Sequence, residues 1–119
     1  MTLGQPVPAN IQVQALIDTG ASGSCVDPSI LAQLTLTPTG STTVNTPTTG
    51  ADAVTVDQYD VGITIPSTPG HAPLFHHTVP VIAANLLVPQ GFHVIIGRDI
   101  LQGCLMTYDG KGGLFSIAW

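Results

Sequence analysis

Hydrophobic and polar residues alternate along much of the chain with the period of a β-strand. The clearest case is the segment 11–15, Ile-Gln-Val-Gln-Ala, which predicts a half-buried strand. It continues into Leu16 and Ile17, where we expect the strand to enter the core. Thr, Val, Ile, Pro and Gly are common, and no segment keeps a helical apolar spacing over three turns. The pattern therefore predicts an all-β fold.

Turn and cap residues divide the rest of the chain into further elements. Asp27 followed by Pro28 predicts a helix through Gln33, with Asp27 as N-cap and Pro28 at the first helical position. The segment 44–59 predicts a hairpin with its tip near residues 47–50. Further strands are expected over residues 25–26, 60–65, 74–83 and 93–96, followed by a short C-terminal helix ending near residue 103 and a hairpin of 105–108 with 114–118. The sequence contains no internal repeat and no linker that would divide it. We therefore expect one domain over residues 1–119.

Composition changes this picture by what it excludes. Hydrophobic residues make up 44% of the chain and charged residues only 8%, a surface consistent with a subunit interface or with poor solubility. The net charge is -5, with Arg98 and Lys111 as the only Lys or Arg residues. So few cations cannot neutralise a phosphate backbone or dock on anionic lipid, which excludes nucleic-acid and membrane-surface binding. The longest apolar stretch, near 79–88, is too short to span a bilayer.

The remaining chemistry-bearing residues give little support to a metal or cofactor site. The N-terminus lacks the basic start and apolar core of a signal peptide, so the simplest compartment is the cytoplasm. Cys25 and Cys104 are expected to be free thiols, although a disulfide remains open. The histidines at 71, 76 and 77 lack regular ligand spacing, and we expect neither a metal nor a cofactor.

One run has the pattern of a catalytic segment: residues 15–22, Ala-Leu-Ile-Asp-Thr-Gly-Ala-Ser. An Asp-Thr-Gly triplet alone is weak, because it is also a good turn sequence. Here it follows an apolar strand, and a second apolar strand ending in glycine, Val-Ile-Ile-Gly at 94–97, comes later and leads into the short helix. The triplet occurs once, so a two-carboxylate site would need two copies of the chain.

In these segments the chain resembles the retropepsin-like aspartic peptidases, single-domain relatives of pepsin that act as homodimers. The matching pieces are residues 15–22, the hairpin with Gln-Tyr-Asp at 58–60 on its return arm, and Ile-Ile-Gly-Arg-Asp-Ile-Leu at 95–101. The last hairpin, 106–109 with 114–117, is similar to the closing hairpin of a pepsin lobe. The resemblance implies a closed, pepsin-lobe-like barrel with a flap hairpin and a short C-terminal helix.

The resemblance also implies roles for the catalytic loop. Asp18 would supply one carboxylate of the dyad, and Asp18 of the partner subunit the other. Thr19 would hydrogen-bond across the two-fold axis, Gly20 would let the substrate backbone approach, and Ala21 would pack behind the loop. Because two adjacent carboxylates cannot both stay ionised cheaply, the pair would share one proton and activate a water for attack on a peptide carbonyl. Activity would then be bell-shaped in pH with an acid optimum.

Substrate contacts are implied on three further segments. A flap over the substrate would be formed by the hairpin tip at Thr48, Thr49 and Gly50. Spacing from Asp18 and Gly97 would bring three further residues toward the substrate pockets: Cys25, His93 and Ile95. The expected partners are therefore a peptide or protein substrate and a second copy of the chain.

One departure from the family's pattern and two alternative functions accompany this interpretation. Retroviral members usually carry an acid at or next to the position of Ser22, where it pairs with the arginine matching Arg98; here that acid is missing, and the partner of Arg98 is open. Asp99 is expected to cap the short C-terminal helix and not to act as a second catalytic acid. One alternative is a catalytically silent domain of the same fold that binds peptides or protein partners. The other is a structural β-domain in which Asp18 is a turn residue.

Overall fold

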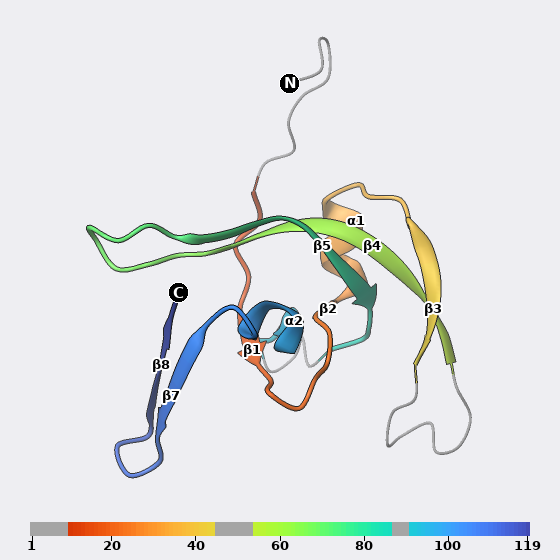
Figure 1. The fold of residues 1–119 in the computed structure, drawn as a ribbon. Coiled ribbons are helices and arrows are strands. Elements are labelled where there is room, and N and C mark those ends of the chain that lie inside the picture. The colour runs from red at the N-terminus through yellow and green to blue at the C-terminus, as the bar shows by residue number, and fades with distance from the viewer. Residues whose placement is uncertain (1–9, 45–53, 87–90) are drawn as a thin grey trace.

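The computed structural model describes residues 10–44, 54–86 and 91–119 as a curled sheet with two short helices and a separate hairpin (Figure 1). The elements in chain order are β1 (Ala15–Ile17), β2 (Cys25–Val26), α1 (Pro28–Gln33), β3 (Gly40–Val44), β4 (Val54–Ile65), β5 (Leu74–Ala83), β6 (Val94–Ile96), α2 (Arg98–Leu101), β7 (Leu105–Asp109) and β8 (Leu114–Ala118). The all-β prediction is confirmed. The described strands form a half-barrel, so the closed barrel stays a prediction.

Six strands form the main sheet in the order β1-β6-β2-β5-β4-β3. β1 and β6 run parallel, and β2 is inserted antiparallel to β6 and parallel to β5. β4 and β5 form a long antiparallel pair that is irregular between Val61 and Ile63. The flap tip with Thr48, Thr49 and Gly50 lies outside the described residues, and its expected arms β3 and β4 pair from Gly40 with Gln58 to Val44 with Val54.

The core packs the strands of the main sheet against the two short helices. Its buried residues come from the strands and from both helices: Val26, Ile30, Leu31, Val61, Val79, Val81, Val94, Ile96 and Ile100. α1 begins as expected, since the Asp27 carboxylate accepts a hydrogen bond from the Ser29 N–H and Pro28 stands in the first turn. The helix predicted through Gln33 is confirmed.

The first strand is shorter than its alternating pattern predicts. Only Ala15 of the segment 11–15 belongs to β1, although Ile11 and Val13 still pack against the core. The expectation that Leu16 enters the core is wrong, because Leu16 is exposed and lines a surface cavity. β1 therefore contributes little to the hydrophobic core. Its main effect is to position the residues that follow it, beginning with Asp18.

Candidate active site

Asp18 stands at the end of β1, at an edge of the main sheet. β1 and β6 are parallel with Ile17 beside Ile96, so Asp18 and Gly97 leave the sheet side by side. The Asp18 N–H donates to the Ile96 carbonyl at 3.0 Å and extends this pairing by one residue. Because strand pairing fixes both ends, the sequence-predicted catalytic residue and the glycine that follows β6 are neighbours in space.

The carboxylate of Asp18 is half-buried and is held by its own loop. Its Oδ1 accepts the Gly20 N–H at 2.9 Å, and the Asp18 carbonyl accepts the Ala21 N–H at 3.2 Å. A side chain at position 20 would stand 3.1 Å from that same Oδ1, so glycine leaves the carboxylate uncrowded. Thr19 and Gly20 are exposed, and Ala21 is half-buried. The Asp18 loop, residues 18–24, thus offers its carboxylate outward with one N–H already donated to it.

Gly97 packs directly under the Asp18 loop. A Cβ at this position would lie 2.6 Å from the Gly23 carbonyl oxygen and 2.9 Å from that of Ala21, both backbone atoms. Only glycine permits this approach, which explains why the second apolar strand ends in glycine. The close packing brings the next residue, Arg98, within reach of the loop.

Arg98 binds the loop through two backbone carbonyls. Its N–H donates to the Ala21 carbonyl at 2.8 Å, and its Nη1 donates to the Thr19 carbonyl at 3.1 Å. The sequence left the partner of Arg98 open, because the acid that retroviral members usually carry is missing; in the structure the partners are the main-chain oxygens of Thr19 and Ala21. A peptide carbonyl is present at every residue, so no sequence signal could have identified it.

Asp99 holds the far end of the loop through Ser24. The Ser24 N–H donates to Asp99 Oδ2 at 3.0 Å and the Ser24 hydroxyl donates to Oδ1 at 2.8 Å. The same hydroxyl accepts the Gly97 N–H at 3.0 Å, and the Ile100 N–H also donates to Asp99 Oδ1. Ser24 is only 2% exposed, so the Ser24 side of this network is shielded from water.

The expectation that Asp99 caps α2 is wrong. The N-cap is Gly97, which makes no side-chain cap bond, and Asp99 lies inside the first turn. Its carboxylate crosses to Ser24, which the sequence analysis did not single out. Because this pair joins residues 75 positions apart, no local pattern points to it.

Cys25 and Ile95 lie on neighbouring strands behind the loop, in register with each other. Burial raises the pKa of the Cys25 thiol, and the negative charges of Asp99 and Asp18 raise it further. The thiol is therefore a neutral group near both carboxylates. The described residues contain no disulfide, and Cys104 is also free.

Ile95 lines an apolar cavity of about 110 Å³ beside the catalytic strand, together with Leu16, Asn85, Leu86 and Phe92. Leu16 precedes Asp18 by two residues, so this cavity lies along the strand that leads to the candidate carboxylate. His93 does not line it. The main chain of His93 bonds to Gln14 and Asp27, and its buried Nδ1 has no partner among the described residues.

Two further features bear on what the site can hold. No group of three or more His, Cys, Asp or Glu side chains within residues 10–44, 54–86 and 91–119 could ligate a metal ion. No helix in the described part of the chain is long and apolar enough to cross a membrane.

Comparison with known proteins agrees with this geometry. The family model described as aspartyl protease matches residues 7–100, which include the Asp18 loop, β6 and most of α2. No curated protein and no solved structure matches the chain. The match covers well over half of the residues and confirms the resemblance drawn from the two motifs. The chain therefore belongs to the aspartyl protease family.

Proposed function

We propose that this protein is an aspartic endopeptidase whose active site is completed by two copies of the chain. The observation that carries the proposal is the anchoring of the Asp18 loop by the segment Gly97–Asp99. That segment fixes the backbone that follows the carboxylate, through the Thr19 and Ala21 carbonyls and through Ser24. On the other side, the Ile96 carbonyl accepts the N–H of Asp18 itself. Catalysis needs reactive groups held in place before substrate arrives, and this loop meets that need.

An aspartic peptidase needs a second catalytic carboxylate, and neither Asp99 nor Asp27 of the same chain is free to supply it. Asp99 accepts three hydrogen bonds, from the Ser24 N–H, the Ser24 hydroxyl and the Ile100 N–H. Asp27 is buried and accepts the N–H groups of Ser29 and Leu86. Because both carboxylates are already engaged, Asp18 of the partner subunit is the best source of the second catalytic acid.

The chemistry follows from bringing two Asp18 carboxylates together. The pair shares one proton, since two adjacent negative charges repel each other. The ionised member removes a proton from a bound water while the protonated member donates to the peptide carbonyl, and a tetrahedral diol forms. The Gly20 N–H donates to Oδ1 of each Asp18 and fixes the orientation of its carboxylate. The apolar cavity formed by Leu16, Phe92 and Ile95 favours a hydrophobic side chain next to the scissile bond.

Cleavage of a diverse peptide mixture from about pH 3 to pH 7 tests the proposal. We compare the native chain with Asp18→Asn, which keeps the shape of the side chain but cannot act as a proton-sharing acid. We expect cuts that are favoured in acid and that disappear in the variant. Asp57→Asn, which removes an exposed acid on β4, is the matched control and should keep native activity.

Two results would contradict the proposal. Cuts that persist in Asp18→Asn would assign the hydrolysis to another group. No cuts by either protein, together with retained peptide binding, would favour the catalytically silent peptide-binding domain.

A further inference from the structure

Arg98 is exposed beside the Asp18 loop, and most of its hydrogen-bonding capacity is unused. A guanidinium group carries five N–H donors in a rigid fork. In the described part of the chain, the side chain of Arg98 makes one hydrogen bond, from Nη1 to the Thr19 carbonyl at 3.1 Å. Because this acceptor is a main-chain oxygen and not a carboxylate, the bond orients the guanidinium but does not neutralise its charge.

The acids near this loop do not neutralise Arg98 either. The carboxylate of Asp99 accepts the N–H and the hydroxyl of Ser24, so it is turned to the other end of the loop. Position 22, where retroviral members usually carry an acid, is an exposed serine. Asp18 is the reactive group of the proposed function. A carboxylate that pairs with Arg98 therefore has to come from a bound molecule.

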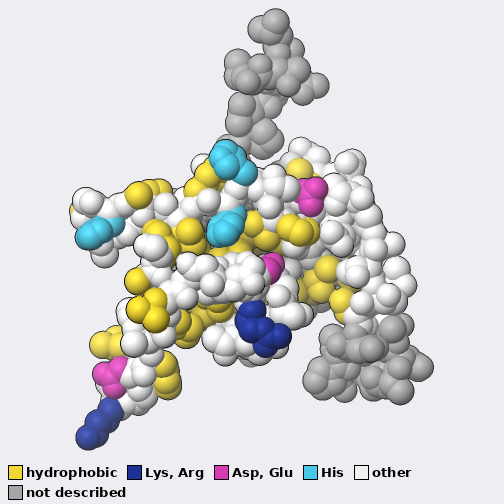
Figure 2. All heavy atoms as spheres, viewed as in Figure 1, with side chains coloured by type: hydrophobic (Ala, Val, Ile, Leu, Met, Phe, Trp, Pro, Cys, Tyr) yellow, Lys and Arg dark blue, Asp and Glu magenta, His cyan; other side chains and the backbone are white. Residues whose placement is uncertain are grey.

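The charge of the whole molecule makes the surroundings of Arg98 distinctive. The chain has a net charge of -5, and its other basic residue is Lys111, in the turn between β7 and β8. Figure 2 shows one basic side chain on the main body and the other at the tip of the projecting hairpin. Because the molecule as a whole repels an anion, attraction of an acidic peptide on the main body is confined to the neighbourhood of Arg98.

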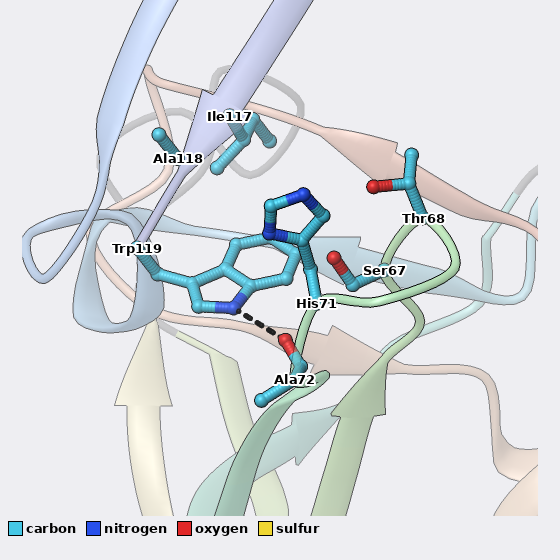
Figure 3. A pocket seen from close by; sticks show the side chains of 7 residues that line it. All are labelled: Ser67, Thr68, His71, Ala72, Ile117, Ala118 and Trp119. Carbon is cyan, nitrogen blue, oxygen red and sulfur yellow. Dashed lines mark hydrogen bonds between the residues drawn. The ribbon is translucent and has the colours of Figure 1, made fainter.

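A cavity of about 340 Å³ between the end of β8 and the loop that joins β4 to β5 offers no such attraction. The Trp119 indole N–H in this cavity already donates to the Ala72 carbonyl at 3.1 Å (Figure 3). No Lys or Arg is among its lining residues, which are Ser67, Thr68, His71, Ala72, Ile117, Ala118 and Trp119. A carboxylate thus finds a permanent positive charge beside the Asp18 loop and none in this cavity.

Arg98 stands within reach of a peptide that is bound at Asp18. Its guanidinium is held by the carbonyl of Thr19, the residue that follows Asp18. An extended peptide advances about 3.3 Å per residue, so the side chain that meets Arg98 belongs to a residue about two to four positions from the scissile bond. In the proposed dimer each chain contributes one Arg98. A two-fold axis therefore places one such position on each side of the scissile bond.

We propose that Arg98 is a specificity-determining residue that binds the carboxylate of a Glu or Asp side chain in the peptide substrate. This inference rests on the proposed function, because it names the class of peptide that the Asp18 site accepts. An ionised carboxylate accepts from two guanidinium N–H groups at once. The amide of a Gln side chain has the same shape but a single oxygen and no charge, so it pairs with Arg98 less well.

Cleavage of matched peptides tests the proposal. Octapeptides with a central Leu-Phe pair carry one Glu at each of the other positions in turn, and each has a twin with Gln. We expect kcat/KM to favour Glu about fivefold at one position on each side of the pair, mainly through KM, and nowhere else. The preference should be present at about pH 5.5 and disappear below about pH 4, because the Glu side chain has a pKa of about 4.3.

Two substitutions separate the charge of Arg98 from its support of the loop. Arg98→Gln keeps an N–H donor for the Thr19 carbonyl but removes the charge, whereas Arg98→Lys keeps the charge. The Glu-to-Gln ratio is measured within each variant, so a loss of overall activity does not affect it. It should fall to about one in Arg98→Gln and stay above one in Arg98→Lys. Lys111→Gln removes the other basic residue and is the matched control, which should keep the native ratio.

Three results would overturn the proposal. They are a native protein that prefers Glu at no position, a native ratio in folded Arg98→Gln, and a Glu preference that persists below about pH 4. If Arg98→Gln does not fold, the native ratio in about 0.5 M NaCl decides. Salt screens an ion pair but not a neutral hydrogen bond, so the ratio should fall toward one, and an unchanged ratio would refute the role of the charge.

Binding to Asp18→Asn distinguishes failure of this inference from failure of the peptidase. The same peptides carry a fluorophore, and their anisotropy is followed as Asp18→Asn protein is added at about pH 5.5. If Glu peptides bind more tightly than their twins but the native protein cuts none, the peptidase is refuted and the Arg98 site stands. If the native protein cuts both twins equally at every position, the Arg98 site is refuted and the peptidase stands. Equal binding without cleavage refutes both.

Discussion

The Asp18 loop and the β7–β8 hairpin differ in what holds each of them. The loop has no regular secondary structure, yet residues 96–99 anchor it through main-chain carbonyls, a guanidinium and a carboxylate. The hairpin is a regular antiparallel pair, yet the side-chain hydrogen bond that ties it to the main body is that of Trp119 to Ala72. Regular secondary structure is thus no measure of how firmly a segment is positioned.

The difference follows from what catalysis requires of each region. A catalytic carboxylate has to be in place before substrate binds, so its support comes from within the chain. The aromatic side chains of the hairpin, Tyr108 and Phe115, are 74% and 55% exposed, so they contribute little to the packing of the single chain. Substitutions should therefore reduce the stability of the single chain strongly at the loop and weakly at the hairpin.

Gly97→Ala should have the largest effect. The added methyl would lie 2.6 Å from the Gly23 carbonyl oxygen, so the backbone of the loop or of β6 has to move. We expect a loss of about 2 to 4 kcal/mol in the free energy of unfolding, measured by urea titration, together with a loss of cleavage. Gly40→Ala is the matched control, because a methyl there meets no atom within 4 Å. Equal stability of Gly97→Ala and the native chain would refute the tight packing under the loop.

Ser24→Ala should have a smaller but still clear effect. It removes the hydroxyl that donates to Asp99 and accepts from the Gly97 N–H, and it leaves both groups without that partner. We expect a loss of about 1 to 3 kcal/mol in unfolding free energy and a lower kcat, measured by urea titration and steady-state kinetics. Ser22→Ala, an exposed hydroxyl in the same loop, should change neither. Native stability in Ser24→Ala would show that the Asp99 pair does not support the loop.

The loss of folding stability at low pH should depend on Asp27, the residue that follows β2. Hydrogen bonds from the Ser29 and Leu86 N–H groups lower the pKa of Asp27 below the ordinary value of an aspartate. A lowered folded-state pKa contributes stability that is complete above the unfolded pKa and is lost as pH falls through the folded value. An Asn side chain has one acceptor oxygen and cannot accept both the Ser29 and the Leu86 N–H groups. Asp27→Asn should therefore cost about 1 kcal/mol near neutral pH and flatten the acid side of the profile.

Urea midpoints measured at a series of pH values check this dependence. Asp57→Asn, an exposed acid on β4, is the control for the loss of one negative charge. A profile in Asp27→Asn that keeps the native slope in acid would contradict the assignment.

The smallest effect on the single chain should come from the hairpin. Below the dimer dissociation constant, Tyr108→Thr/Phe115→Thr should change the unfolding free energy of the main sheet by less than ~0.5 kcal/mol, because both rings are already exposed. Thermal unfolding of dilute protein followed by circular dichroism measures this change. A large loss at that dilution would show that the hairpin is part of the monomer's own core and would remove the contrast with the Asp18 loop.

Local signals in the sequence predicted the elements well. Asp27 and Pro28 mark the start of α1 by a hydrogen-bonding preference that needs no tertiary context, and the predicted strand over 74–83 agrees with the bounds of β5. Leu16 shows the limit of such signals. Its apolar side chain is typical of a core residue, but its exposure depends on which strands flank it.

The support of the candidate site could not be predicted in the same way. The Asp18 motif and the Gly97 motif were each visible, and strand pairing made them neighbours. The bond from Arg98 to the Thr19 carbonyl and the pairing of Ser24 with Asp99 depend on the folded path of two distant segments. Every residue has a main-chain carbonyl, so the sequence does not mark the one that accepts from Arg98. Ser24 and Asp99 are far apart in the sequence, so no characteristic spacing marks them as a pair.

A mixing experiment tests the central claim, that one active site is shared by two chains. Increasing amounts of Asp18→Asn protein are added to a fixed amount of native protein, well above the dimer dissociation constant, and peptide cleavage is followed after the subunits have exchanged. If each site needs two Asp18 residues, cleavage should fall to about half at equal amounts and to about a tenth at a ninefold excess. Cleavage that depends only on the native protein, whatever the excess of Asp18→Asn, would contradict a shared site.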